Sequence, residues 1–119
     1  MSIERFVKVG DDPFITITGG VDTAELLNMS GEVKEHHIAI RFKDGAGADV
    51  VPTAGTVRFQ ASQFRDPYYD EVQDGFFNAV DVNDSSRVRP TVGGPVRAFK
   101  VTLDSVVGAT TAIVKITSF

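Results

Sequence analysis

The chain has 119 residues, a net charge of −4 at pH 7 and no cysteine, which is the size of one domain. The lack of cysteine excludes disulfides, zinc–thiolate sites, iron–sulfur clusters and cysteine nucleophiles, and the acidic balance disfavours a nucleic-acid partner. No apolar run approaches the roughly 20 residues of a membrane helix, and the first residues lack the apolar region of a secretory signal. We therefore expect one domain over residues 1–119, with neither a membrane nor a nucleic acid as partner.

Short extended segments separated by turn residues recur in the first half of the chain. Residues 5–9 are short and extended, and residues 14–18 are rich in β-branched side chains between a Gly-Asp-Asp-Pro turn and Gly19-Gly20. Residues 22–29 are the only segment that offers a helical turn, with Asp22 or Thr23 as its cap. Residues 36–43 alternate strictly, which predicts a strand with one buried face. Its expected inner residues are Ile38, Ile40 and Phe42, and its outer residues are His37, Ala39, Arg41 and Lys43.

The middle of the chain continues the pattern after a turn at residues 44–47. Residues 56–62 alternate again, with Val57, Phe59 and Ala61 expected inside and Arg58, Gln60 and Ser62 outside. Residues 64–75 are interpreted as a polar aromatic loop, residues 77–82 as a strand and residues 87–91 as an extended segment closed by Gly93-Gly94-Pro95.

The last 24 residues contain the clearest pattern. Apolar side chains alternate with polar ones twice, around a turn that contains Gly108. This predicts an antiparallel pair of strands with one buried face. The expected core residues are Phe99, Val101, Leu103, Ala112, Val114 and Ile116. Seven or eight strands with little helix predict an all-β fold, an antiparallel β-sandwich or jelly roll.

No catalytic motif is visible, so we expect a protein that is not an enzyme and needs no cofactor or metal. The adjacent His36 and His37 should point to opposite faces of a strand, which disfavours one shared metal ion, and we expect one or both rings to be exposed. The polar loop, which we call the acidic loop, also contains four acids, and their oxygens could bind Ca²⁺. These acids are Asp66, Asp70, Glu71 and Asp74, but their spacing does not fit an EF-hand. A solvated loop or a contact surface is the favoured interpretation.

Two features of this region point to a protein contact. Tyr68 and Tyr69 lie in the acidic loop, where aromatic side chains favour interfaces with a protein over stacking on a sugar. Charge is also segregated along the chain. Residues 66–86 carry six acids and no base (Asp66, Asp70, Glu71, Asp74, Asp81 and Asp84), whereas residues 87–103 carry four bases and no acid (Arg87, Arg89, Arg97 and Lys100). Such patches can meet between copies, so the candidate interaction residues are Tyr68, Tyr69, Asp70, Glu71, Arg87 and Arg89.

Two segments resemble small β-sandwich virion proteins of tailed bacteriophages. They are Gly-Thr-Val-Arg-Phe-Gln-Ala-Ser at residues 55–62 and Pro-Val-Arg-Ala-Phe-Lys-Val-Thr-Leu-Asp-Ser-Val-Val-Gly-Ala at residues 95–109. The resemblance covers about half of the chain and implies a head decoration, fibre-base or tail accessory protein. The acidic Tyr68-Tyr69 loop departs from the pattern, because a hairpin with glycine and tryptophan is expected there, so no binding residue is carried over.

We therefore expect a non-enzymatic virion structural protein, such as a capsid decoration or cement protein, made in the host cytoplasm. Its expected partners are itself, as a trimer or another closed ring, and another virion protein such as a capsid protein. The alternative is a carbohydrate-binding β-sandwich module, which needs an exposed aromatic platform. The candidates for that platform are Tyr68, Tyr69, Phe76 and Phe77.

Overall fold

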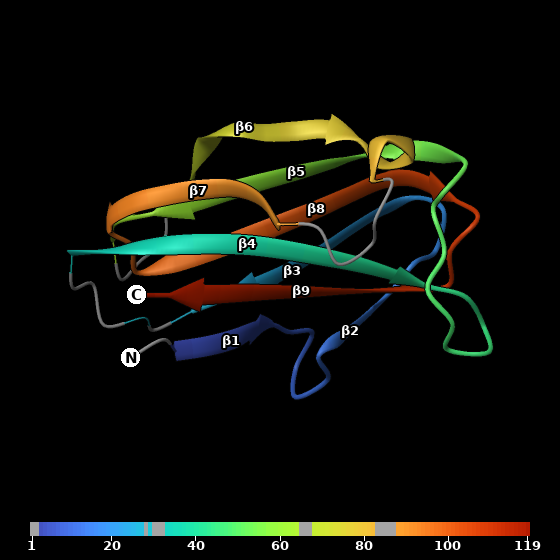
Figure 1. The fold of residues 1–119 in the computed structure, drawn as a ribbon, viewed down its shortest axis with the longest axis horizontal. Helices are drawn as coiled ribbons and strands as arrows, with labels where there is room; N and C mark the ends of the chain where they lie inside the picture. The colour runs from blue at the N-terminus through green and yellow to red at the C-terminus, as the bar shows by residue number, and fades with distance from the viewer. Residues whose placement is uncertain (1–2, 28, 30–32, 65–67, 83–87) are drawn as a thin grey trace.

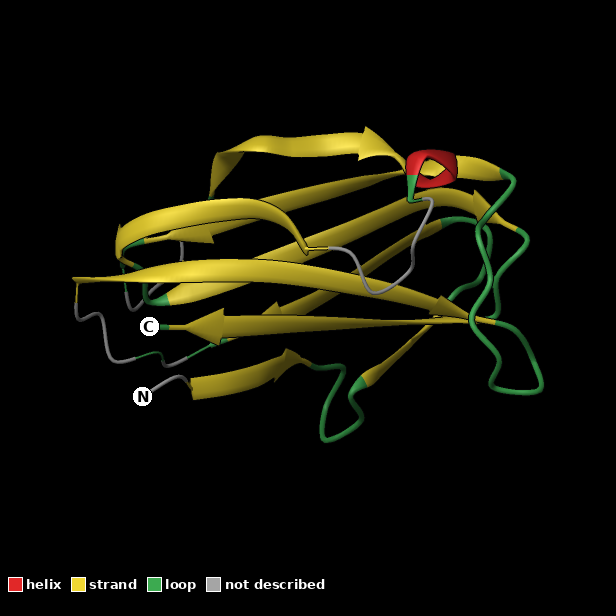
Figure 2. Cartoon of the chain, in the orientation of Figure 1, coloured by secondary structure: helices red, strands yellow, loops and turns green. Residues whose placement is uncertain are grey.

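Strands make up most of the computed structural model, which describes residues 3–27, 29, 33–64, 68–82 and 88–119 (Figures 1 and 2). The described residues form nine strands and one 3-10 turn. In chain order these are β1 (Ile3–Val7), β2 (Phe14–Thr16), β3 (Val21–Leu26), β4 (Val33–Lys43), β5 (Ala54–Ser62), β6 (Asp70–Asn78), the turn η1 (Ala79–Asp81), β7 (Val88–Pro95), β8 (Ala98–Val107) and β9 (Thr111–Ser118). No helix within the described ranges is long and apolar enough to cross a membrane.

The strands form two antiparallel sheets packed face to face. Sheet A has the order β1-β9-β4-β7, and β2 also pairs with β9; sheet B has the order β3-β8-β5-β6. Figure 1 shows the two layers, with both ends of the chain at the same end of the sandwich. The prediction of an all-β antiparallel sandwich is confirmed, with nine strands in the described part of the chain.

The first two strands together form one edge of sheet A. Both pair with β9, β1 with its C-terminal half and β2 with its N-terminal half. Between them, Val9 and Asp12 exchange hydrogen bonds of 3.0 and 3.2 Å in a tight turn, and the Lys8 amide donates to the Glu25 carbonyl of β3 over 3.4 Å. This detour links the edge of sheet A to the edge of sheet B on one side of the sandwich.

The core lies between the sheets, where alternate residues of the central strands meet. Every core residue predicted from the alternation of 36–43 and of the last 24 residues is at most 1% exposed. Because successive side chains of a strand point to opposite faces, this burial fixes which face of each strand turns outward. The outward residues are the ones that remain for function.

The predicted pairing of the last two strands is wrong. β8 pairs with β3 and β5 in sheet B, whereas β9 pairs with β1, β2 and β4 in sheet A. The chain crosses from one sheet to the other at residues 108–110. The Thr53 amide donates to the Val107 carbonyl, and the Thr110 amide donates to the Lys43 carbonyl, each over 2.8 Å. Two strands that face each other across a core bury alternate residues just as a hairpin does, so periodicity alone did not distinguish them.

Two other segments differ from expectation. Where a helical turn was predicted at residues 22–29, residues 22–26 form a strand instead, because Val21–Leu26 pairs with β8 along its whole length. Residues 64–75 are not all loop, since β6 starts at Asp70, and the strand expected at 77–82 ends at Asn78. The register between β5 and β6 shifts between Arg58 and Gln60, and Asp74 has a φ of 60°. This bulge interrupts the alternation of β6 and hides the strand from sequence patterns.

Candidate interaction site

Two exposed aromatic side chains are held at one end of the sandwich by a buried serine. Ser62 ends β5 and is 2% exposed, although the alternation predicted it outside. Its Oγ accepts hydrogen bonds from the backbone amides of Phe64 and Tyr68, both over 3.1 Å. A buried hydroxyl is stable when its polar group is bonded, and here that bonding places Phe64, 61% exposed, near Tyr68, 74% exposed. The aromatic pair Phe64 and Tyr68 is thus presented to solvent, with the backbone amide of each residue anchored to Ser62.

Tyr69 has a different environment from its neighbour. It is half-buried, and its hydroxyl donates to the Glu25 carboxylate of β3. The Nζ of Lys100, on β8, lies 5.6 Å from the centre of the tyrosine ring. Burial, followed by the hydrogen bond to Glu25 and the negative charge of that carboxylate, raises the pKa of Tyr69 well above its usual value. Tyr69 therefore packs on the outer face of sheet B, in contact with β3 and β8. Tyr68 is the tyrosine available to a partner.

The two acids that follow also separate. The Oε1 of Glu71 lies 3.3 Å from the Nε of Arg58 on β5, and the guanidinium of Arg58 lies 5.0 Å from the ring centre of Phe76. Asp70 is exposed and lines a cleft at the start of β6. Glu71 is thus engaged within the sheet, while Asp70 keeps its carboxylate at the rim of the cleft.

The two predicted basic residues cannot be assigned contacts. Arg87 lies outside the described residues, and Arg89 is placed in the backbone of β7 without a described side chain. From the same basic stretch, Lys100 contacts Tyr69 within the chain.

The cleft opens between the two sheets, where the edge strands β6 and β7 approach each other. It has a volume of about 360 Å³, with Val72, Val92 and Val96 among its apolar lining. Its polar lining includes Gln63, Asp70, Gln73 and Thr91, and Phe64 stands at its side. A cleft of a few hundred Å³ with convergent polar groups suits a small polar ligand or one side chain of a partner.

The two histidines take opposite faces, as predicted. His36 is 2% exposed, in contact with Phe99 at a ring distance of 5.7 Å, so it does not line an open site. His37 lies on the outer face of sheet A against Phe119, at a ring distance of 5.0 Å. Within the described ranges no three histidine, aspartate or glutamate side chains converge on a point where a metal ion could bind. Asp66 of the proposed Ca²⁺ loop lies outside those ranges.

The chain folds as a small antiparallel β-sandwich with two exposed aromatic side chains, Phe64 and Tyr68, at one end. The chain belongs to the family DUF7265, a domain of unknown function, whose model matches residues 11–118. No curated protein matches the chain.

Proposed function

We propose that the chain is a non-enzymatic structural protein of a tailed-bacteriophage particle, which acts by self-association and by docking on another virion protein. The observation that carries the proposal is the aromatic pair Phe64 and Tyr68, held to one buried hydroxyl of Ser62. Aromatic side chains contribute large contact area, and an anchored backbone amide at each of the two residues lowers the entropic cost of docking.

The edge strands of both sheets disfavour pairing with a strand of another molecule, so a partner should contact the loops or the sheet faces. The edge strand β7 contains Pro90 and Pro95, and proline cannot donate to a new strand. The opposite edge of sheet A is interrupted between β1 and β2. The edge strand β6 of sheet B contains a bulge, and three acidic residues lie along the strand. Short, bulged, charged or proline-containing edges are the devices by which β-proteins avoid edge-to-edge pairing.

Phage particles produced from a phage genome that lacks the gene for this chain provide the test of docking. Purified native chain added to such particles should bind, and the double variant Phe64→Ser with Tyr68→Ser should bind at least about tenfold more weakly, because hot-spot aromatics carry most of the binding energy. The matched control is Val21→Ser, since Val21 is 65% exposed at the opposite end of the sandwich. Equal binding by the native chain and the double variant would refute this docking surface.

The cleft between β6 and β7 favours a second candidate function, a carbohydrate-binding module. Carboxylate, amide and hydroxyl groups from Asp70, Gln73 and Thr91 line it beside Phe64, and this combination suits the hydroxyl groups and the apolar face of a sugar ring. Binding of a set of neutral oligosaccharides, followed by titration calorimetry, tests this candidate. Asp70→Asn with Gln73→Ala should abolish sugar binding and leave binding to particles unchanged if both functions exist.

A further inference from the structure

We propose that the outer face of sheet A is a self-association surface, on which a second copy of the chain packs antiparallel about a two-fold axis. The inference rests on the self-association in the proposed function and names its surface. The axis lies in the plane of the interface and runs across the strands, so that β4 of one copy covers β4 of the other in the opposite direction.

The charge order along β4 is self-complementary in that orientation. Its outward residues, taken from the N-terminal to the C-terminal end, are Glu35, His37, Ala39, Arg41 and Lys43. Along β4 the order is therefore an acidic end, a small central residue and a basic end. An antiparallel copy of β4 has the reverse order, so the basic end of each copy lies over the acidic end of the other. A two-fold axis repeats this match, and complementary charge fixes partner and register.

The centre of the same face is apolar and hollowed. The register aligns Phe6, Lys115 and Ala39 in one row across β1, β9 and β4, and Phe14, Ile113 and Arg41 in the next. Phe6 is 37% exposed and Phe14 is 44% exposed. Between the rows lies a hollow of about 400 Å³, lined by Glu4, Phe6, Ala39, Arg41, Ile113 and Lys115. A second copy would remove this apolar surface from water.

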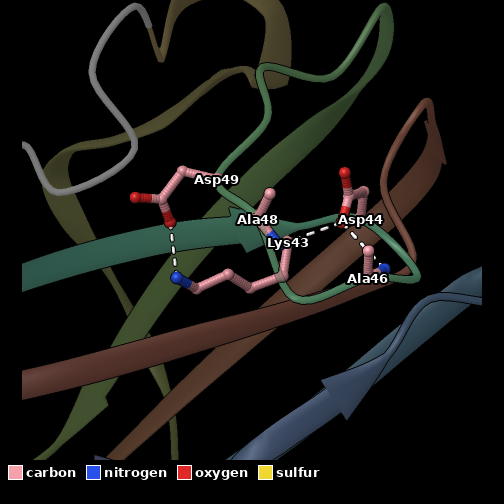
Figure 3. A network of polar contacts seen from close by, with 5 residues as sticks. All are labelled: Lys43, Asp44, Ala46, Ala48 and Asp49. Carbon is pink, nitrogen blue, oxygen red and sulfur yellow. Dashed lines mark hydrogen bonds and ion pairs between the residues drawn. The ribbon is translucent and has the colours of Figure 1, made fainter.

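Among the described side chains of the face, three charges are neutralised within the chain, and Glu35 and Arg41 are left for a partner. Glu4 pairs with Lys115 over 3.5 Å, and Lys43 pairs with Asp49 over 2.6 Å at the end of β4 (Figure 3). The neighbouring Asp44 is occupied by the amides of Ala46 and Ala48, both at 2.9 Å (Figure 3). Arg41 is exposed and has no ion pair with any residue of the described ranges.

With the two-fold axis over Ala39, Arg41 of a second copy lies opposite His37, one outward row of about 6.7 Å from Glu35, a distance that the long arginine side chain spans. The carboxylate of Glu35 is largely exposed, and its Oε1 lies 3.3 Å from the Nε2 of His37, a pair that is ionic only when the imidazole is protonated. Among the described residues, Glu35 thus has no ion pair with a lysine or arginine side chain. Antiparallel packing brings the partner's guanidinium over this end of β4, where the two unpaired charges meet.

The area of this face limits the expected affinity of the dimer. Four strand positions about 4.8 Å apart and five outward rows about 6.7 Å apart give roughly 640 Å² per copy, or roughly 1,300 Å² in all. This is the lower end of specific interfaces, so we expect a reversible dimer with a dissociation constant in the micromolar range. The self-complementary pattern of β4 supports a two-fold pair in place of the trimer expected from the charge segregation.

A charge-reversal experiment tests the surface directly. Arg41→Glu and Glu35→Arg are purified separately and studied by sedimentation velocity. Each variant alone places like charges together and should dimerise at least about tenfold more weakly than the native chain, but an equimolar mixture of the two should form heterodimers. Rescue by mixing cannot arise from a defect of folding, because both variants must be folded to restore each other.

Two further variants complete the design. Arg58→Glu makes the same charge change on the outer face of sheet B and should dimerise like the native chain. Phe6→Ser leaves charge unchanged and should weaken the dimer. Native dimers that ignore both charge reversals, or a mixture that stays monomeric, would overturn this surface and leave the self-association of the proposed function in place. A native chain that is monomeric at high concentration would overturn both.

Discussion

The Nδ1 of His36 and the Oγ of Ser118 lie 2.7 Å apart in the core, where β4 and β9 pair. The Nε2 of the same ring lies 3.2 Å from the carbonyl of Gly94 on β7. A carbonyl only accepts, so Nε2 donates, and in the neutral ring Nδ1 accepts from the serine hydroxyl. One imidazole therefore connects three neighbouring strands of sheet A.

Breaking this connection should cost stability in a coupled way. Ser118→Ala removes the hydrogen bond to Nδ1, and His36→Leu removes the bonds to the Ser118 hydroxyl and the Gly94 carbonyl, at about 1–3 kcal/mol for each buried polar group that loses this bond. Because the two residues share one hydrogen bond, the double variant should lose less than the sum of the single variants. Urea unfolding measures all three, with Thr117→Ala on the outer face as control. Additivity within about 0.5 kcal/mol would show that the bond is not formed.

Gly55 should tolerate no side chain. Its φ is 111°, and a Cβ there would lie 2.5 Å from the Cα of Val106 in β8. We expect Gly55→Ala to destabilise the fold by about 3 kcal/mol or more, because backbone strain and a clash combine. The matched control is Gly93→Ala, where φ is ordinary and no atom lies within 4 Å of the added group. Equal unfolding midpoints in urea for the two variants would contradict the placement of β5 against β8.

Phe99 should be a main contributor to the core. It is 1% exposed, and truncation to alanine removes buried apolar surface and leaves a cavity. We expect Phe99→Ala to lower the free energy of unfolding by about 3–5 kcal/mol. Val107→Ala, at the exposed end of the same strand, should change it by less than about 0.5 kcal/mol. A loss below about 1 kcal/mol for Phe99→Ala in urea unfolding would refute the inward face of β8.

Tyr69 should make the stability of the fold depend on alkaline pH. Its pKa is higher in the folded chain than the usual value of about 10, so above that pH the unfolded chain loses the phenolic proton first. Stability from this group is complete below about pH 10 and declines as the pH rises further. Between pH 8 and a pH above 10, the urea midpoint of unfolding should fall more for the native chain than for Tyr69→Phe. Tyr68→Phe is the matched control and should follow the native chain.

The alternation of apolar residues predicted the inner faces of β4, β5, β8 and β9, because the hydrophobic effect imposes a period of two on any half-buried strand. It did not predict which strands pair, since Phe99 and Val114 would be buried equally in a hairpin or across two sheets. β6 was concealed by its bulge at Asp74 and Gly75, and Ser62, which its register with β8 places on the outer face of β5, is buried where it bonds the amides of Phe64 and Tyr68.

The candidate site was predicted only in part. Tyr68 is exposed, as a contact residue requires, but Tyr69 bonds to Glu25, 44 residues away, and Glu71 pairs with Arg58 on the preceding strand β5. Sequence spacing contains no information on such long-range partners. The outer face of sheet A was missed because Phe6 and Phe14 come from two short strands whose alignment beside β9 appears only in the fold.

The central claim is that the chain is a structural component of a virus particle. The most direct measurement is quantitative mass spectrometry of purified phage particles produced from the genome that encodes it, with the major capsid protein as internal standard. The account predicts that the chain remains with the particles through a density gradient, in many copies per particle and in a fixed ratio to the capsid protein. Its absence from intact particles, while it is abundant in the lysate that produced them, would contradict the account.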